Sequence, residues 1–161
     1  MIIKKLSIIL MAMVLPFALM SCSDDTVSVD LDDENDDEPV ELVYAISFSV
    51  GDGVATFTVD MTDVSGFDPE DHSVFITGSL LGWAEPGSDP ERQELVLMVD
   101  GDTEIPVIEP EATGDVEYKY FSDFVAEGWD GGEWAGDPNR SATLEEGATI
   151  ADEWGEQPAD D

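Results

Sequence analysis

Positive charge is scarce in this chain of 161 residues. Lys and Arg together number 5 against 39 Asp and Glu, so the formal net charge is −34 at pH 7. Such an acidic surface repels phosphate backbones and anionic lipid headgroups. The composition therefore argues against nucleic-acid binding and against electrostatic attachment to a membrane. It favours adaptation to a salty environment, in which counterions screen the self-repulsion.

Groups for nucleophilic or metal chemistry are also scarce. The chain has one cysteine, Cys22, and one histidine, His72, so no internal disulfide and no Cys-His or Ser-His-Asp set is expected. His72 falls in the segment DPEDHS just before an expected strand, where we predict a solvent-exposed turn position rather than a general base. A glycosidase with paired carboxylates stays open, because almost any fold of so acidic a chain brings some acids together. We expect no enzymatic activity, no cofactor and no bound metal.

The only long apolar run lies at the N-terminus. Lys4 and Lys5 precede an uncharged stretch from Leu6 to Leu19, and its 14 residues are fewer than the roughly 20 of a membrane-spanning helix. A basic start, a short apolar stretch and a small residue before a cut are typical of a secretory signal peptide. We predict a signal peptide over residues 1–21.

The segment Leu19-Met20-Ser21-Cys22 resembles the lipobox of bacterial lipoproteins. The resemblance implies cleavage before Cys22, lipidation of its thiol and new amino group, and a place in the cell envelope, at the outer membrane or the cell surface. An ordinary cleaved signal followed by a free cysteine is the alternative. Cleavage removes Lys4 and Lys5 but no acidic residue, so the net charge changes from −34 to −36.

An acidic segment follows the lipobox. Residues 23–41 contain ten carboxylates, no basic residue and no aromatic residue. Such a composition buries too little apolar surface to offset the entropy lost on ordering. We predict a disordered tether over residues 22–41 and an acidic tail over residues 157–161. A calcium loop in residues 30–38 is disfavoured, because the glycine that an EF-hand needs at its sixth position is missing.

Alternation of larger apolar with smaller or polar residues begins at Leu42. It covers residues 42–50 and 54–61 on either side of Gly51-Asp52-Gly53, which predicts two strands around a tight turn. Further β-rich runs cover residues 73–79, 94–100, 103–108, 116–122, 141–144 and 148–154. No segment has a sustained helical period. We therefore predict an all-β domain over residues 42–156, built as an antiparallel sandwich of seven or eight strands.

Aromatic residues and the scarce positive charge gather late in the chain. In VEYKYF (116–121), strand alternation places the two tyrosines on one face and Lys119 and Phe121 on the other. The glycine-rich loop that follows carries Trp129 and Trp134. A flat apolar ring flanked by hydrogen-bonding groups suits the face of a sugar ring. The alternative is that the tryptophans plug the ends of the sandwich.

Four segments carry a resemblance to a known family: ITGSLLGW (76–83), VEYKYF (116–121), EWAGDPNR (133–140) and TIADEW (149–154). In this order and spacing they resemble the starch-binding domain of carbohydrate-binding module family 20 and its glycogen-binding relatives. The similarity covers roughly residues 55–156. It implies an immunoglobulin-like β-sandwich that binds α-1,4-glucan without cleaving it.

The resemblance also implies a binding site. The site would consist of Trp83, Lys119 and Trp134, with Asn139 hydrogen-bonded to sugar hydroxyls. Trp154 corresponds to a tryptophan that is buried in the family, so it is not expected in the site.

The chain departs from the family pattern in two places. Leu81-Gly82-Trp83 lacks the polar residue that usually precedes the tryptophan and could help to fix the loop. The inserted segment EGWDGG (127–132) adds Trp129, which would either extend the aromatic platform or cover it. We expect Arg140 to tie this loop to a neighbouring carboxylate.

The sequence therefore predicts a lipid-anchored protein that holds α-glucan near glycoside hydrolases or other envelope proteins carried on separate chains. The alternative, from a different class, is a structural or protein-interaction sandwich of an envelope complex, with no sugar ligand.

Overall fold

The computed structural model describes residues 40–99 and 101–159. They belong to one compact unit, Asp37–Asp161. Strands dominate this unit and helices are short, so the predicted all-β class is confirmed. No helix in the described ranges is long and apolar enough to cross a membrane.

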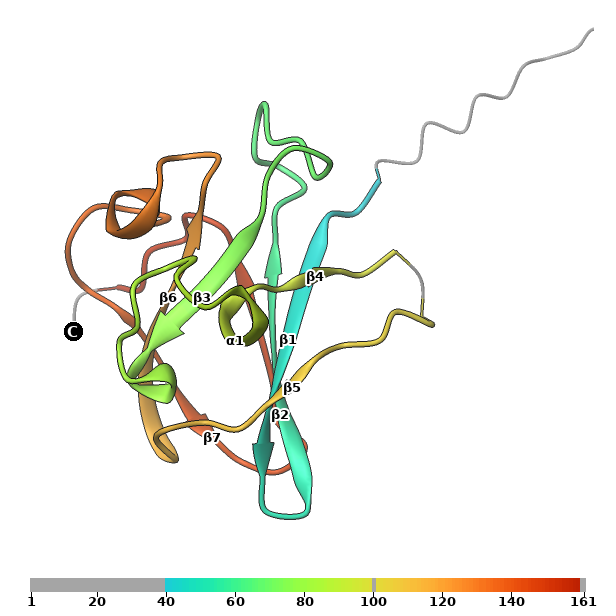
Figure 1. Ribbon diagram of the computed structural model, residues 1–161, viewed down its shortest axis with the longest axis vertical. Helices are drawn as coiled ribbons and strands as arrows, with labels where there is room; N and C mark the ends of the chain where they lie inside the picture. Colours follow the sequence, from blue (N-terminus) through green and yellow to red (C-terminus); the bar gives the residue numbers. More distant parts are fainter. Residues whose placement is uncertain (1–39, 100, 160–161) are drawn as a thin grey trace, which may run out of the picture. The chain divides into compact units, whose positions relative to one another are not determined.

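The strands form two sheets (Figure 1). The larger sheet contains β1 (Val43–Val50), β2 (Gly53–Asp60), β4 (Val96–Leu97), β5 (Val107–Ile108) and β8 (Thr149–Glu153), with β4 and β5 beside β1 and β8 beside β2. The smaller sheet has the order β3 (Val74–Gly78), β6 (Gly114–Ser122), β7 (Arg140–Leu144). Three short helices, η1 (Ser79–Leu81), α1 (Pro90–Gln93) and η2 (Gly128–Gly131), lie in the connections.

The predicted hairpin of β1 and β2 is confirmed. Val50 pairs with Gly53, which leaves Gly51 and Asp52 as a two-residue turn. Along β2 the buried residues alternate with partly exposed ones, so Phe57 and Val59 point into the core. This is the pattern of a strand with one face on the core and the other toward solvent.

The expectation of a purely antiparallel arrangement is wrong at two places. β8 runs parallel to β2 over five residue pairs, and β5 pairs in parallel with β1. The reason for the first pairing is local: the amide of Gly147 donates to the carbonyl of Val54, so the chain enters β8 beside the start of β2. A strand that starts there and follows the edge of β2 must run in the same direction.

The runs expected over residues 94–100 and 103–108 form only two-residue strands. Glu94 makes a bridge to Phe75 in the smaller sheet, whereas Val96 already pairs with Ala45 in the larger one. The chain therefore changes sheets at Leu95, which divides the run between two partner strands. Pro106 further restricts the second run, because proline has no amide hydrogen to donate to a neighbouring strand.

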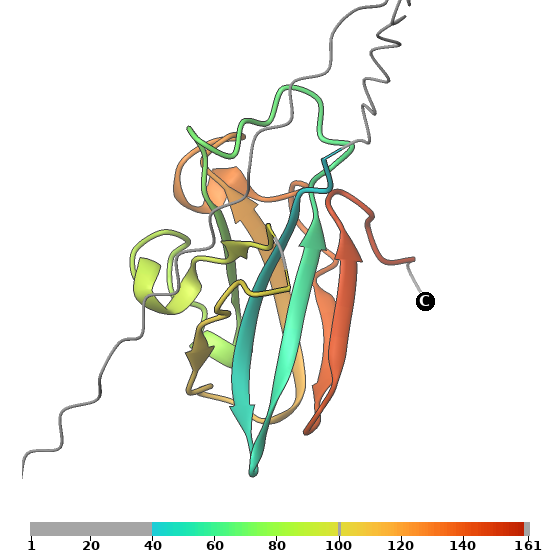
Figure 2. The ribbon, with the colours of Figure 1, turned by 90° about the vertical axis from the view of Figure 1, so that its right-hand side faces the viewer.

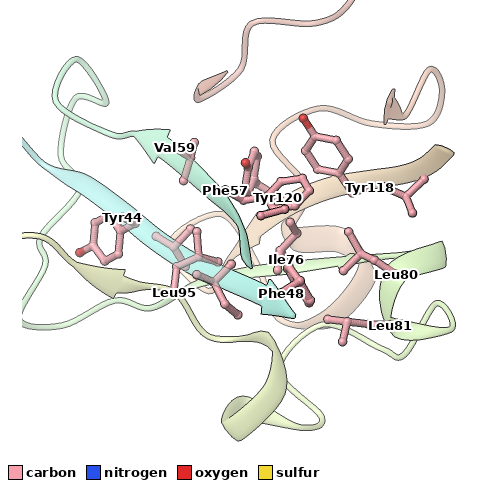
Figure 3. Packing of buried hydrophobic residues seen from close by; sticks show 14 of the residues in the cluster. Tyr44, Phe48, Phe57, Val59, Ile76, Leu80, Leu81, Leu95, Tyr118 and Tyr120 are labelled. Carbon is pink, nitrogen blue, oxygen red and sulfur yellow. The ribbon is translucent and has the colours of Figure 1, made fainter. Parts of the chain in front are cut away.

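The core lies between the two sheets, which Figure 2 shows as separate layers. Its residues come from both sheets: Phe57 of β2 packs edge to face on Tyr118 of β6, with 4.9 Å between ring centres. Phe48 and Ile76, one from each sheet, are fully buried in the same cluster (Figure 3). Each such side chain stabilises the fold by roughly 1.5 to 3 kcal/mol through burial. This core holds β6 rigidly, and β6 presents its other face to the site described next.

Candidate functional site

A groove of about 610 Å³ lies on the outer side of the smaller sheet. It is bounded by the turn after η1, by β6 and by the segment from Val125 to Asn139. All five residues that the sequence singled out for a sugar site line this one groove: Trp83, Lys119, Trp129, Trp134 and Asn139. The fold thus brings together residues from distant parts of the chain.

Trp83 reaches the groove from a tight turn at the end of η1. The amide of Gly82 donates to the carbonyl of Ser79 at 3.3 Å, and that of Trp83 donates to the carbonyl of Gly78 at 2.8 Å. These two bonds form a Schellman motif. Gly82 takes its φ of 62° readily, whereas Trp83, at 58°, is the one non-glycine residue with positive φ in the described part of the chain.

The backbone at Trp83 therefore stores strain on the order of 1 kcal/mol. It holds the indole at the edge of the groove with 38% of the residue exposed. Leu81, on the other side of Gly82, is 2% exposed and belongs to the core cluster. Backbone hydrogen bonds and this buried leucine fix the turn without the polar residue that the sequence pattern lacks.

Lys119 lies on the predicted face of β6 but is not in open solvent. Tyr118 and Tyr120 point into the core, as the alternation predicts, and Lys119 points to the groove side. The segment after η2 covers Lys119 and leaves only 5% of it exposed. Its Nζ donates to the carbonyl of Gly136 at 2.5 Å. Burial lowers the pKa of Lys119, while the carboxylate of Glu133 opposes that shift.

Trp134 is half-buried and is held by several contacts. The ammonium group of Lys119 lies 4.7 Å from the ring centre, and the guanidinium carbon of Arg140 lies 5.1 Å from it. The indole Nε1 donates to the carbonyl of Pro138 at 2.9 Å. The orientation of the ring is therefore set by the protein itself. A ligand would meet the remaining ring surface rather than the indole N–H.

Arg140 anchors this part of the groove to the core. It is 6% exposed, and its Nε and Nη2 donate to the two carboxylate oxygens of Glu133 at 3.0 and 2.7 Å. Its Nη1 donates to Asp152 of β8 at 2.9 Å. Burial alone would lower the pKa of Arg140, but the two carboxylates outweigh it and raise that pKa. The predicted tie between Arg140 and a neighbouring carboxylate is confirmed.

Asp152 extends this anchor into the core. One of its carboxylate oxygens accepts hydrogen bonds from the hydroxyls of Tyr118, at 2.8 Å, and Tyr120, at 2.9 Å. Burial and the negative charge of Asp152 raise the pKa of both tyrosines. Groove, β8 and core are therefore connected through one chain of charged and polar groups.

Trp129 belongs to η2 and is the most exposed tryptophan of the groove, at 49%. Its ring meets that of Phe121 edge to face, with 5.7 Å between the centres. Gly131 allows η2 to close against the end of β6, because a Cβ there would collide with the carbonyl oxygens of Ser122 and Ala126. Of the two roles left open for Trp129, the geometry favours extending the aromatic surface, since its ring lines the groove and remains exposed.

The groove combines indole rings, one ammonium group, the Asn139 amide and several carboxylates. Stacking surface with donors and acceptors around it suits a neutral, hydroxyl-rich ligand. An anionic ligand would meet the exposed side chains of Asp130 and Asp137. No protein-family model, no curated protein and no solved structure matches this chain. Its function is therefore inferred from the residues that line the groove.

Phe121 and Val125 are among the groove residues that were not predicted for the site. The alternation along β6 does place Phe121 on the same face as Lys119, so the signal for it was present. Val125 follows the strand in an irregular segment, where side-chain direction has no period to follow.

Two other residues considered from the sequence lie outside the groove. Trp154 directly follows β8, is half-buried and packs against the core cluster, away from the groove. His72, predicted at a solvent-exposed turn position, is partly exposed: its side chain is 31% exposed, and its ring packs edge to face on Phe124 with 5.4 Å between centres. His72 Nδ1 lies 3.4 Å from a carboxylate oxygen of Asp123.

The signal peptide over residues 1–21, the lipidation site Cys22 and residues 22–39 of the predicted tether fall outside the described residues. Within the described ranges, no three His, Cys, Asp or Glu side chains are grouped so that they could hold a metal ion.

Proposed function

We propose that this domain is an immunoglobulin-like β-sandwich that binds α-glucan in the groove without cleaving it. The observation that carries the proposal is the convergence on one groove of Trp83, Lys119, Trp134 and Asn139. These residues match the sugar-binding positions of the starch-binding family that the sequence resembles. The two-layered core and the outward presentation of β6 support the finer fold assignment.

Binding would rest mainly on ring stacking. The faces of Trp83 and Trp134 would pack on glucose rings, while Lys119 and Asn139 donate hydrogen bonds to sugar oxygens. Each stacking contact contributes about 1 kcal/mol, so the affinity is expected in the micromolar to millimolar range. Display of many anchored copies would raise the effective affinity for a long polymer.

Binding without cleavage is supported by the state of Glu133. Its side chain is 0% exposed and both of its carboxylate oxygens accept hydrogen bonds from Arg140. A glycosidase needs a carboxylic acid that can reach the glycosidic oxygen and a second carboxylate on the other side of the sugar. Glu133 is committed to its ion pair and cannot take either role in this arrangement.

The setting of the domain follows from the N-terminal segments. Lipidation of Cys22 and the acidic tether over residues 22–41 would hold the domain on the cell envelope, at the outer membrane or cell surface. There it would keep glucan close to glycoside hydrolases carried on other chains.

A pull-down on insoluble starch at high salt tests the proposal. The compact unit, residues 37–161, is compared with its Trp134→Ala and Trp83→Ala variants, with cellulose as the control polymer. Val107→Ala is the matched control variant, because Val107 is 57% exposed and does not line the groove. Circular dichroism spectra establish that each variant is folded.

We expect the unit and its Val107→Ala variant to stay on starch and not on cellulose, and both tryptophan variants to be lost from starch. Retention of both tryptophan variants would place the binding surface elsewhere. If the folded unit remains in the supernatant with both polymers, the sugar proposal is wrong. The groove would then be better explained as a protein-interaction surface, a role that would agree with the half-burial of Trp134.

A further inference from the structure

A second cleft adjoins the groove on the same side of the smaller sheet. It encloses about 390 Å³ and lies between the segment Glu85–Ser88, which follows η1, and the segment from Phe121 to Gly128 at the end of β6. Phe121 lines both the cleft and the groove. Figures 1 and 2 show both segments beside the end of β6, outside the sheet.

The first turn of η2 separates the two hollows. Gly128 lines the cleft, and the next residue, Trp129, lines the groove. A Cβ on Gly128 would lie 3.0 Å from a carboxylate oxygen of Glu85, so the two segments approach closely at this point. The exposed ring of Trp129 therefore lies at the boundary between the two hollows. A sugar chain that extends from the groove would pass this ring to enter the cleft.

The floor of the cleft is aromatic. Phe75 of β3 and Phe121 of β6 are directly paired across the two strands and both line the cleft. Phe121 also supports the ring of Trp129 from its edge. Aromatic surface therefore continues from the groove, past Trp129, into the cleft.

The charged side chains of the cleft are all carboxylates. The side chains of Glu85, Asp123 and Glu127 line it, and among the described residues no lysine or arginine does so. Carboxylates accept hydrogen bonds but donate none when ionised. The cleft therefore favours a ligand that brings hydrogen-bond donors and carries no negative charge, such as a neutral sugar with its hydroxyls.

We propose that Trp129 and this cleft form an additional subsite that extends the groove, so that a long neutral glucan occupies both. The inference rests on the proposed function of the groove. Its distinct consequence is a dependence on chain length: a short oligosaccharide fills the groove alone, whereas a longer one extends past Trp129 and also contacts the acceptors of the cleft.

Isothermal titration of residues 37–161 with maltotriose and with maltoheptaose tests this extension. The variants are Trp129→Ala and Glu127→Ala, both at exposed positions where truncation leaves the core intact. Glu104→Ala, another exposed carboxylate that lines neither hollow, is the matched control. Trp134→Ala reports on the groove itself. A longer oligosaccharide also offers more binding registers, which raises its affinity for the wild type without any extra contact. The test therefore rests on how each variant changes the two affinities, not on the ratio of the wild-type affinities.

We expect Trp129→Ala to weaken maltoheptaose binding about fivefold, the effect of losing one stacking contact, and to weaken maltotriose binding by a smaller factor, because the short ligand does not extend past Trp129. Glu127→Ala should act in the same direction and Glu104→Ala should have no effect. Trp134→Ala should weaken both ligands. If Trp129→Ala weakens both oligosaccharides equally, or neither, the extension is wrong while the groove stands. If neither oligosaccharide binds the wild-type unit, the proposed function fails and the extension fails with it.

Discussion

The ammonium group of Lys119 lies 4.7 Å from the centre of the Trp134 ring and donates a hydrogen bond to the carbonyl of Gly136. A cation in this position is attracted by the ring and holds it in place. An ammonium group has three donors, so Lys119 has N–H bonds left for a ligand. The same side chain therefore supports the aromatic surface and can bind what lies on it.

Replacing Lys119 with methionine separates these two roles, because methionine keeps the apolar stem and removes the charge. Relief of the desolvation of the ammonium group offsets the lost hydrogen bond and ring contact, so the free energy of unfolding should change by less than about 1 kcal/mol. Affinity for maltoheptaose should fall about tenfold, since a charged donor is lost. Calorimetric titration and urea unfolding measure the two effects. Unchanged affinity would show that Lys119 gives no hydrogen bond to the ligand.

Arg140→Met should strongly destabilise the fold. The variant leaves the carboxylates of Glu133 and Asp152 buried without their cation, which costs about 3 kcal/mol or more. Urea unfolding followed by tryptophan fluorescence measures this loss. Arg92→Met is the control, because the ion pair of Arg92 with Glu111 is exposed and should contribute less than about 1 kcal/mol. Equal losses for both variants would contradict the role of Arg140 as a buried anchor.

Much of the fold follows from local patterns that the tertiary structure leaves intact. The hairpin of β1 and β2 follows from strict alternation around Gly51-Asp52, and the two faces of β6 follow from VEYKYF. The parallel pairing of β8 with β2 could not be predicted in this way. It depends on where the chain crosses from one sheet to the other, and alternation along a strand carries no information about its neighbours.

The sequence predicted several residues that line the groove, but not how exposed each of them is. The resemblance named Trp83, Lys119 and Trp134, and the fold brings them to one groove. The burial of Lys119 could not be foreseen, because it depends on how the segment after η2 folds back over β6. Nothing in the residue pattern indicates that a loop rich in glycine and acidic residues would cover a lysine.

Alkaline pH should destabilise the domain through its buried tyrosines. The pKa of Tyr118 is raised by burial and by Asp152, whereas an unfolded tyrosine titrates near its ordinary value of about 10. Above about pH 10 the unfolded chain therefore loses protons that the folded chain keeps, and the free energy of unfolding falls as pH rises. At about pH 11 one such group lowers it by about 1.4 kcal/mol.

Tyr118→Phe tests this assignment, because phenylalanine has no proton to lose. Urea unfolding should show that the free energy of unfolding falls less between about pH 8 and about pH 11 for the variant than for the wild type. The values at about pH 8 give the cost of losing the hydrogen bond to Asp152 separately. If the free energy of unfolding falls equally for the two proteins, other groups cause the loss of stability at alkaline pH. Tyr120 is the nearest of these groups.

Salt should stabilise the domain, because residues 37–161 contain 32 acidic side chains and only 3 basic ones. Raising the ionic strength from about 0.1 M to about 1 M shortens the screening length from about 10 Å to about 3 Å, so repulsion between neighbouring carboxylates weakens. This screening stabilises the folded state more than the unfolded state, since the charges of the folded state lie closer together. Thermal unfolding in NaCl and in KCl should therefore show a midpoint that rises equally in both salts. A midpoint that rises in only one of them would indicate a specific cation site in place of general screening, and a midpoint independent of salt would contradict adaptation to a salty environment.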